Sequence, residues 1–254
     1  MQKLNDRLKA IALNISPGET VADIGTDHGF LPLFLWEKEI SPKIILTDVS
    51  EKSLQKAKAN AGALQFGNQL LFRTGYGLSV IEQGEVDVIV IAGMGGLLIQ
   101  KILEKDPDKT KTFKKLLLQP RNNTGKLRCW LCRNGFYISG EHLAREGKYI
   151  CQIIEAIPSE EKEKYNTDGS IYNKQSSEEF KHISPDDIRW EMPPWVFEKK
   201  NELASEFLKR AITTEEKILE SIKKSKRTDE KEKEEKKIKA GIEYLRSISL
   251  KEER

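Results

Sequence analysis

A short stretch near the N-terminus, residues 21–29, constrains the fold of this 254-residue chain more than any other feature. A β-prone apolar run ends in Asp23, Gly25 follows, and a helix-like apolar segment begins at Phe30. Glycine allows the backbone to approach a ligand closely and to adopt dihedral angles that other residues avoid. The pattern therefore predicts a strand, a ligand-binding loop and a helix whose N-terminus faces the ligand.

The next strand-like run, residues 43–47, ends at Asp48, about 20 residues after the glycine loop, where doubly wound folds place the carboxylate that binds a nucleoside ribose. The loop lacks the Gly-x-Gly-x-x-Gly pattern of dinucleotide-binding proteins. The carboxylate of Asp23 would repel a pyrophosphate but attract an ammonium group. These features favour S-adenosylmethionine over a nicotinamide cofactor. The alternative is that Asp23 and Gly25 only shape a turn.

Strand-like and helix-like runs alternate along residues 1–158. The expected strands are 20–24, 43–47, 70–73, 86–92, 115–118, 136–141 and 149–156, and the expected helices are 4–14, 30–36, 50–60 and 124–134. Such alternation predicts an α/β fold, a Rossmann-like and mostly parallel doubly wound sheet with helices on both faces. Ligands bind at the carboxyl ends of such strands, where we expect Asp23, Asp48, Tyr76 and Gly93.

The composition changes after Pro158. Residues 159–192 are mostly polar and predict a linker or extended segment. Two apolar stripes with helical spacing follow, separated by the charged run from Lys223 to Lys237. They predict a C-terminal α-helical hairpin, similar to a coiled coil, over residues 193–254. We expect it to help bind the substrate.

Composition narrows the class of protein. No run approaches the roughly 20 apolar residues of a membrane span, and the N-terminus lacks an apolar signal core, so we expect a cytoplasmic protein without membrane partners. The net charge is only +3, so polyanion binding would use local patches. Cys129 and Cys132 form a Cys-x-x-Cys without a second pair, which argues against a metal site.

The glycine-rich loop after the fourth expected strand, residues 93–96, permits close approach of a flat ligand. Met94 could pack against a base or a sulfonium, although the loop could also be only a tightly packed turn. If the target is N1 of adenine, its lone pair attacks without prior deprotonation. A carboxylate near the N6 amino group, for which Asp27 is the candidate, could then orient the base and stabilise the cationic product. Asp27 could instead cap the next helix, and His28 could only satisfy backbone groups.

Two groups of cations could contact phosphates. The first follows the fifth expected strand and contains Arg121, Lys126, Arg128 and Arg133. The second, at the start of the C-terminal hairpin, includes Lys199 and Lys200. The alternative for both groups is a solvated charged face, which is common on helices.

Residues spread over most of 4–156 carry a family resemblance. They are Leu4, Arg7, Leu8, Ile11, Ala12, residues 22–32, 47–50, 91–96 and 118–120, Leu127, Arg128, Trp130, Leu131, Gly135, Phe136 and Glu141. The chain is similar to the bacterial tRNA (adenine(22)-N1)-methyltransferases of the TrmK type. The resemblance implies a class I methyltransferase domain followed by a coiled-coil-like helical domain.

The resemblance also implies roles for residues of this chain. Asp27 and Met94 would lie at the transfer site, and Arg7 would join the RNA-binding cations. The cofactor would contact Asp23, Gly25, His28, Asp48, Val49, Tyr76, Gly77 and Gly93. Tyr76 stands where the family usually has an acid, so we expect its ring to stack or its hydroxyl to bond.

The leading hypothesis is therefore an enzyme that methylates N1 of an adenosine in tRNA, adenosine 22, as a monomer or weak dimer. One alternative is a methyltransferase acting on another RNA site, a small molecule or a protein. Another is a catalytically inactive homologue that binds RNA or the cofactor.

Overall fold

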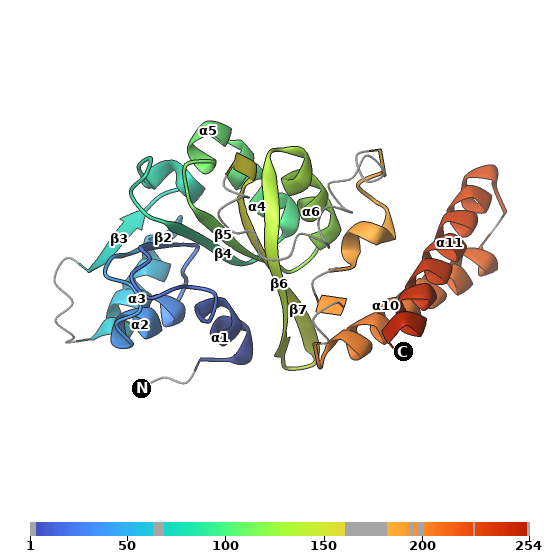
Figure 1. Ribbon diagram of the computed structural model, residues 1–254, viewed down its shortest axis with the longest axis horizontal. Helices are drawn as coiled ribbons and strands as arrows, with labels where there is room; N and C mark the ends of the chain where they lie inside the picture. The colour runs from blue at the N-terminus through green and yellow to red at the C-terminus, as the bar shows by residue number, and fades with distance from the viewer. Residues whose placement is uncertain are drawn as a thin grey trace.

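The computed structural model describes residues 4–62, 69–160, 182–193, 196–197, 201–225 and 227–252. Its strands are β1 (Val21–Ile24), β2 (Ile44–Asp48), β3 (Leu70–Thr74), β4 (Val88–Met94), β5 (Lys115–Pro120), β6 (Phe136–Glu146) and β7 (Tyr149–Pro158). They form one sheet in the order β3-β2-β1-β4-β5-β7-β6 (Figure 1). The first five strands pair in parallel, whereas β7 pairs antiparallel to β5 and β6. The expected Rossmann-like doubly wound fold is confirmed.

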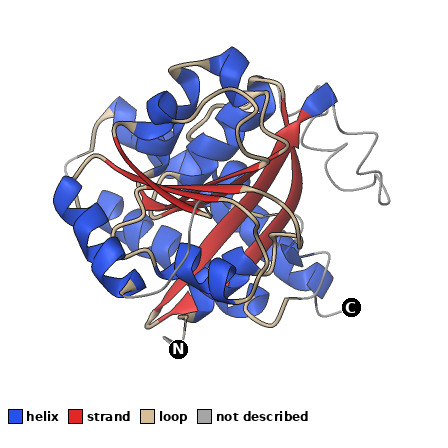
Figure 2. Ribbon diagram, turned by 90° about the vertical axis from the view of Figure 1, so that its left-hand side faces the viewer, coloured by secondary structure: helices blue, strands red, loops and turns tan. Residues whose placement is uncertain are grey.

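Helices cover both faces of the sheet (Figure 2). They are α1 (Asp6–Ala12), α2 (Phe30–Glu37), α3 (Glu51–Ala61), α4 (Gly96–Glu104), α5 (Pro107–Thr110) and α6 (Thr124–Arg133), with a short 3-10 helix η1 (Gly77–Val80). The parallel strands alternate between two cores: Ile24, Ile89 and Leu118 face α4 and α6, whereas neighbouring residues face α1, α2 and α3. Burial on both faces explains why these strands read as nearly continuous apolar runs.

The strands and helices of residues 1–158 lie close to their expected positions, with several differences. The short helices η1 and α5 were not expected. Helix α4 follows the glycine loop directly, and no helix was expected there. Strand β6 continues to Glu146 instead of ending near Glu141. The residues His142–Glu146 are mainly polar or charged because they extend past the central sheet, so their sequence carries only a weak strand signal.

The C-terminal segment forms a helical hairpin, as expected, from α10 (Ala204–Lys224) and α11 (Asp229–Glu252) (Figure 1). Leu208 and Leu245 are buried where the two helices pack. The charged run after Lys223 was expected to be the turn, but most of it is the first half of α11. Lys and Glu are good helix formers, and acids in the first turn of α11 suit the helix dipole. Among the described residues, none of the helices could cross a bilayer.

The end of the expected linker packs against the first part of the chain. Residues 182–193 include the 3-10 helix η3 (Ile188–Glu191), and Trp190 within it is 1% exposed. Trp190 packs with Ile183 against Cys129 of α6. The three-part division of the chain stays a prediction, and most of residues 159–181 lie outside the described ranges.

The expected phosphate contact of Arg128 is wrong, because its side chain is fully buried. Its Nε donates to Glu141 Oε1 at 2.8 Å and its Nη2 to Gln152 Oε1 at 2.9 Å. Nη1 donates to the carbonyl of Trp190. Helix α6 lies between the sheet and residues 182–193. The face of α6 that points away from the sheet is therefore covered by this segment and not by solvent. The Arg128 cluster holds that segment in place.

We expect Arg128→Met to lower the free energy of unfolding by about 3–5 kcal/mol, because Glu141 would keep its buried charge without the guanidinium. Urea unfolding measures the change. Arg246→Met is the matched control, since Arg246 pairs with Glu216 at 2.7 Å on the exposed surface of the hairpin and such pairs stabilise proteins little. Equal losses in the two variants would contradict the structural role of Arg128.

Candidate functional site

The loop between β1 and α2 folds over the carboxyl end of β2. The backbone N–H groups of Gly25 and Thr26 both donate to the Thr47 carbonyl, at 2.8 and 2.9 Å. Gly25 has a φ of +78°, a left-handed conformation that costs glycine nothing. The loop thereby brings the end of β1 beside the end of β2, as expected for a nucleoside-binding crevice.

Asp23, at the end of β1, is 7% exposed and accepts a hydrogen bond from Thr26 Oγ1 at 2.7 Å. Burial raises the pKa of its carboxyl to about 6, against the opposing effects of the Thr26 hydroxyl and the positive charge of Arg7. The nearby charge of Asp48 raises this pKa further. The two carboxylates therefore lie close enough to interact. A cationic ligand would stabilise the ionised form of Asp23, which burial and Asp48 destabilise.

Asp48 ends β2, and its Oδ1 accepts from the Ser50 backbone N–H at 2.8 Å. Two large apolar side chains beside this strand end are exposed to solvent: Val49 at 65% and Tyr76 at 41%. Lys105 Nζ lies 5.2 Å from the centroid of the Tyr76 ring. Gly77, with φ +54°, turns the chain sharply after Tyr76 and packs on Ile102 of α4. A carboxylate beside exposed apolar surface suits a ribose with an attached flat base.

The carboxyl end of β4 carries a bulge at Gly93, where the pairing with β5 shifts register. The Gly93 N–H donates to Gln119 Oε1 at 3.1 Å, and Arg7 Nη1 donates to the same oxygen at 3.0 Å. Met94 then lies against Gly25, so closely that a Cβ on Gly25 would collide with its methyl group. The structure thus joins the first loop to the loop after β4.

A further glycine, Gly96, fixes the direction of this loop. Gly96 donates its N–H to the Asn122 carbonyl at 2.9 Å, and a Cβ there would lie 2.6 Å from the Asn123 carbonyl oxygen. Any larger residue would push α4 away from the loop after β5. The residues 93–96 therefore form a tightly packed turn, and the close approach of a flat ligand to them stays a prediction.

Arg7 was expected to contact RNA, but its side chain is largely buried beside the site, where it contacts Glu146 and Gln119. Its side chain is 14% exposed, and its Nε pairs with Glu146 Oε1 at 2.8 Å. With its bond to Gln119, the guanidinium links α1, β5 and the end of β6. The sequence analysis assigned no role to Gln119 or Glu146. The signals for Gln119 were its position in Gln-Pro at a strand end and its place among the residues that carry the family resemblance.

Asp27 and His28 lie in the first loop, where Asp27 is exposed and His28 is half-buried. Asp27 pairs with Lys56 Nζ at 3.6 Å and with His28 Nε2 at 3.4 Å. The His28 ring stacks on Phe30, with ring centroids 5.2 Å apart. Helix α2 begins after Gly29 without a side-chain cap, so Asp27 does not cap it. The catalytic role of Asp27 stays a prediction.

The remaining expected RNA contacts differ in their surroundings. Arg121 is exposed, and a Cβ on Gly93 would lie 3.7 Å from its Nε, which places it at the rim of the loop after β4. Lys126 pairs with Asp186 at 2.8 Å, and Arg133 Nη2 donates to the Ile183 carbonyl at 2.6 Å. Lys199 and Lys200 lie outside the described residues.

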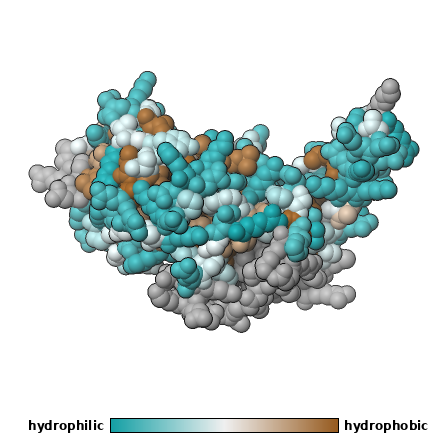
Figure 3. All heavy atoms as spheres, turned by 90° about the horizontal axis from the view of Figure 1, so that it is seen from above, coloured by the Kyte–Doolittle hydropathy of each residue, from teal (hydrophilic) through white to brown (hydrophobic). Residues whose placement is uncertain are grey.

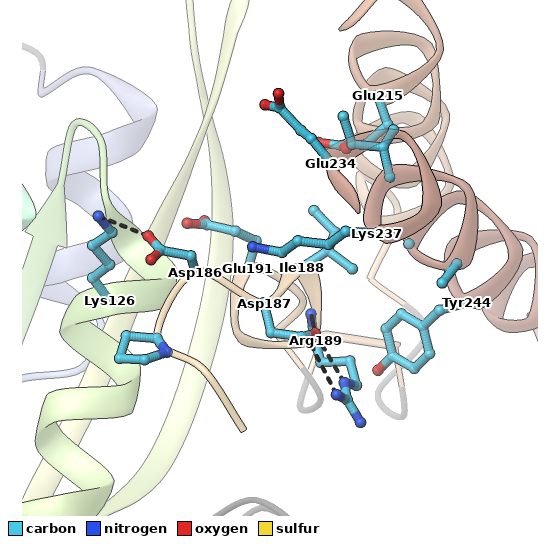
Figure 4. A pocket seen from close by; sticks show the side chains of 14 residues that line it. Lys126, Asp186, Asp187, Ile188, Arg189, Glu191, Glu215, Glu234, Lys237 and Tyr244 are labelled. Carbon is cyan, nitrogen blue, oxygen red and sulfur yellow. Dashed lines mark hydrogen bonds and ion pairs between the residues drawn. The ribbon is translucent and has the colours of Figure 1, made fainter. Parts of the chain in front are cut away.

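A separate cavity of about 620 Å³ lies between residues 185–191 and the C-terminal hairpin (Figure 4). Its walls carry both charges, including Lys126, Glu191, Glu215 and Lys237. Burial raises the pKa of Glu215, and Lys237 opposes this shift. None of its lining residues belongs to the crevice at the carboxyl ends of β1, β2 and β4. The face of the hairpin seen in Figure 3 is largely hydrophilic.

The two cysteines of the Cys-x-x-Cys, Cys129 and Cys132, are both free, and burial raises the pKa of the Cys132 thiol to about 12. A thiol with so high a pKa is a poor nucleophile or ligand at neutral pH. Among the described residues, no three or more His, Cys, Asp or Glu side chains are arranged to bind a metal ion.

Residues 4–154 match a family described as a methyltransferase domain. The chain is 33% identical over 154 residues to the tRNA (adenine(22)-N(1))-methyltransferase of Bacillus subtilis, in an alignment that covers 61% of this chain and 65% of that relative. The alignment thus spans slightly less than two thirds of the relative's length.

Solved structures extend the similarity over nearly the whole chain. The B. subtilis m1A22 tRNA methyltransferase TrmK superposes with a TM-score of 0.80 at 26% identity, covering 98% of this chain and 99% of that one. A Streptococcus pneumoniae protein solved in complex with S-adenosyl-L-methionine gives 0.74 at 25% identity, covering 95% and 97%. The resemblance expected from the sequence is confirmed, and the chain belongs to the methyltransferase domain family, in which it is similar to TrmK.

Proposed function

We propose that this protein transfers a methyl group from S-adenosylmethionine to N1 of an adenosine in tRNA, adenosine 22. The observation that carries the proposal is the junction of three strand ends: Asp23 and Asp48 lie at the carboxyl ends of the neighbouring strands β1 and β2, and Met94 of β4 packs on Gly25 in the loop after β1. The similarity to TrmK over both the sheet and the hairpin supports the choice of substrate.

The residues of the crevice fit the proposed cofactor. Asp23, whose pKa is raised by burial, would bind the ammonium group, and Asp48 would accept hydrogen bonds from the ribose hydroxyls. Val49 and Tyr76 would cover the flat adenine with apolar surface. When bound, S-adenosylmethionine supplies an electrophilic methyl group on its sulfonium.

The chain's own contribution to transfer is mainly positioning. N1 of adenine has a lone pair, so the enzyme need not remove a proton before attack. The open backbone of Gly93, with Met94 beside it, would hold the base against the methyl group, and such alignment of reactants supplies about 7–11 kcal/mol. The carboxylate of Asp27 would accept a hydrogen bond from the N6 amino group and stabilise the positive ring that forms.

The direct test is methylation of an unmodified tRNA transcript with labelled S-adenosylmethionine, followed by digestion to nucleosides. We expect N1-methyladenosine, and its loss when adenosine 22 is replaced by guanosine. Another methylated nucleoside would assign a different RNA target. If neither transfer nor cofactor binding occurs, the proposal is wrong for the wild-type chain, and Tyr76→Asp would test whether the missing acid is the cause.

The raised pKa of Asp23 predicts that cofactor binding depends on pH. We expect the affinity for S-adenosylhomocysteine to fall by roughly tenfold as the pH drops from 7.5 to 5, because protonated Asp23 cannot pair with the ammonium. Calorimetry measures the affinity, and Asp23→Asn, which keeps the bond from Thr26, should bind weakly without this pH dependence. A flat profile for the wild type would contradict the role of Asp23.

The same pKa predicts how the free energy of unfolding of the ligand-free protein changes with pH. The native state holds a proton on Asp23 up to about pH 6, whereas the unfolded state releases it near pH 3.8. Stability therefore falls as the pH rises through this window. We expect Asp23→Asn to gain on the order of 3 kcal/mol over the wild type between pH 4 and pH 7. Urea unfolding at both pH values measures this difference.

Asp27→Asn should lower kcat by about 100-fold, because an amide cannot stabilise the cationic product. We expect the KM for tRNA and the affinity for S-adenosylhomocysteine to change less than threefold, as the shape of the side chain is kept. Lys56→Met, which removes the surface partner of Asp27, is the control and should leave kcat near the wild-type value. An unchanged kcat in Asp27→Asn would refute the proposed role.

A further inference from the structure

The tip of the β6–β7 hairpin projects past the carboxyl end of β5. Strand β7 pairs with β5 only over 154–156, so residues 149–153 of β7 extend beyond the last paired residue of β5. The turn is tight, with Gly147 at φ +57° and Glu146 directly opposite Tyr149. The tip therefore lies at the same edge of the sheet as the loop that contains Gly93.

This tip is fastened from two sides. Glu146 Oε1 accepts from Asn5 Nδ2 at 2.9 Å and from Arg7 Nε at 2.8 Å, which ties the tip to α1. On the other side, Glu206 of α10 pairs with Arg145 of β6. Arg210 of α10 also donates to the backbone carbonyl of Lys148. These contacts hold a short two-residue turn in one orientation between the methyltransferase sheet and the C-terminal hairpin.

The tip presents an aromatic ring to solvent. Tyr149 is 62% exposed, and Lys148 Nζ lies 5.4 Å from the centroid of its ring. Side chains alternate along a strand, and Ile150 packs with Leu143 and Phe207 toward α10. Tyr149 and Cys151 therefore point to the opposite face.

The charged groups around Cys151 show which residues lie on that face. Burial and the charge of Glu146 raise the pKa of the Cys151 thiol, and the charges of Arg7 and Arg121 oppose this shift. Both guanidinium groups also lie near Gly93, where a Cβ would be 3.9 Å from Arg7 Nη1 and 3.7 Å from Arg121 Nε. Tyr149 thus stands on the face of the sheet that carries α1 and Arg7 and that leads to Gly93.

We propose that Tyr149 is a stacking platform for a nucleobase of the substrate that neighbours the methylated adenosine, with Lys148 and Arg121 placed for the adjoining phosphates. The inference rests on the proposed function. A base that enters the crevice must leave its stack, and its neighbours then lose a stacking partner. An exposed aromatic ring beside basic side chains is the surface that binds such bases, whatever their sequence. Because the tip is fastened, little entropy is lost when the ring binds.

The test compares Tyr149→Ala with the matched variant Tyr149→Phe, which keeps the ring. We expect Tyr149→Ala to raise the Kd for an unmodified tRNA transcript by about tenfold or more, while Tyr149→Phe stays within twofold of the wild type. The affinity for S-adenosylhomocysteine and the melting temperature should be unchanged in both variants, since Tyr149 touches neither the crevice nor the core.

A second readout detects stacking itself. A transcript with 2-aminopurine beside adenosine 22 should lose fluorescence when it binds the wild type or Tyr149→Phe, and lose much less with Tyr149→Ala. If Tyr149→Ala binds tRNA within twofold of the wild type, the platform is refuted while the proposed function stands. If the wild type binds S-adenosylhomocysteine but no tRNA, both proposals are overturned.

Discussion

The candidate transfer site depends on two hydrogen bonds that the side-chain carbonyl of Gln119 accepts. This carbonyl accepts from the Gly93 backbone N–H and from Arg7 Nη1, and Gln119 itself is 2% exposed. The first bond holds the bulge that turns Met94 toward Gly25. The second fixes the guanidinium that pairs with Glu146 at the hairpin tip. Because a buried donor without a partner costs about 1–3 kcal/mol, both bonds restrict where the loop can lie.

The crevice beside Gln119 contains a carboxyl group whose ionised form is electrostatically unfavourable. Asp23 and Asp48 are neighbouring acids at the ends of adjacent strands, and Asp23 is buried in the folded protein. Burial with a like charge nearby destabilises the ionised form, which a protein tolerates where a ligand compensates it. A strongly perturbed carboxyl in such a crevice marks a functional site on physical grounds. The same arrangement explains why binding of a cation and stability of the ligand-free protein should respond oppositely to rising pH.

The sequence predicts the parts of this protein that follow local rules. The five parallel strands are recognisable as apolar runs, and Asp23 and Asp48 are recognisable because glycine and strand ends frame them. The fate of Arg7 and Arg128 could not be predicted, because each depends on partners more than 10 positions away: Gln119 and Glu146 for Arg7, Glu141 and Gln152 for Arg128. A basic residue looks the same in sequence whether it faces solvent or a distant acid.

The structure of the complex with S-adenosylhomocysteine would test the central claim most directly, namely that the carboxyl ends of β1, β2 and β4 form the cofactor and transfer site. The account predicts the ligand's ammonium beside Asp23, its ribose hydroxyls on Asp48, its adenine against Val49 and Tyr76, and its sulfur facing Met94. A ligand bound instead in the cavity between residues 185–191 and the C-terminal hairpin would contradict it.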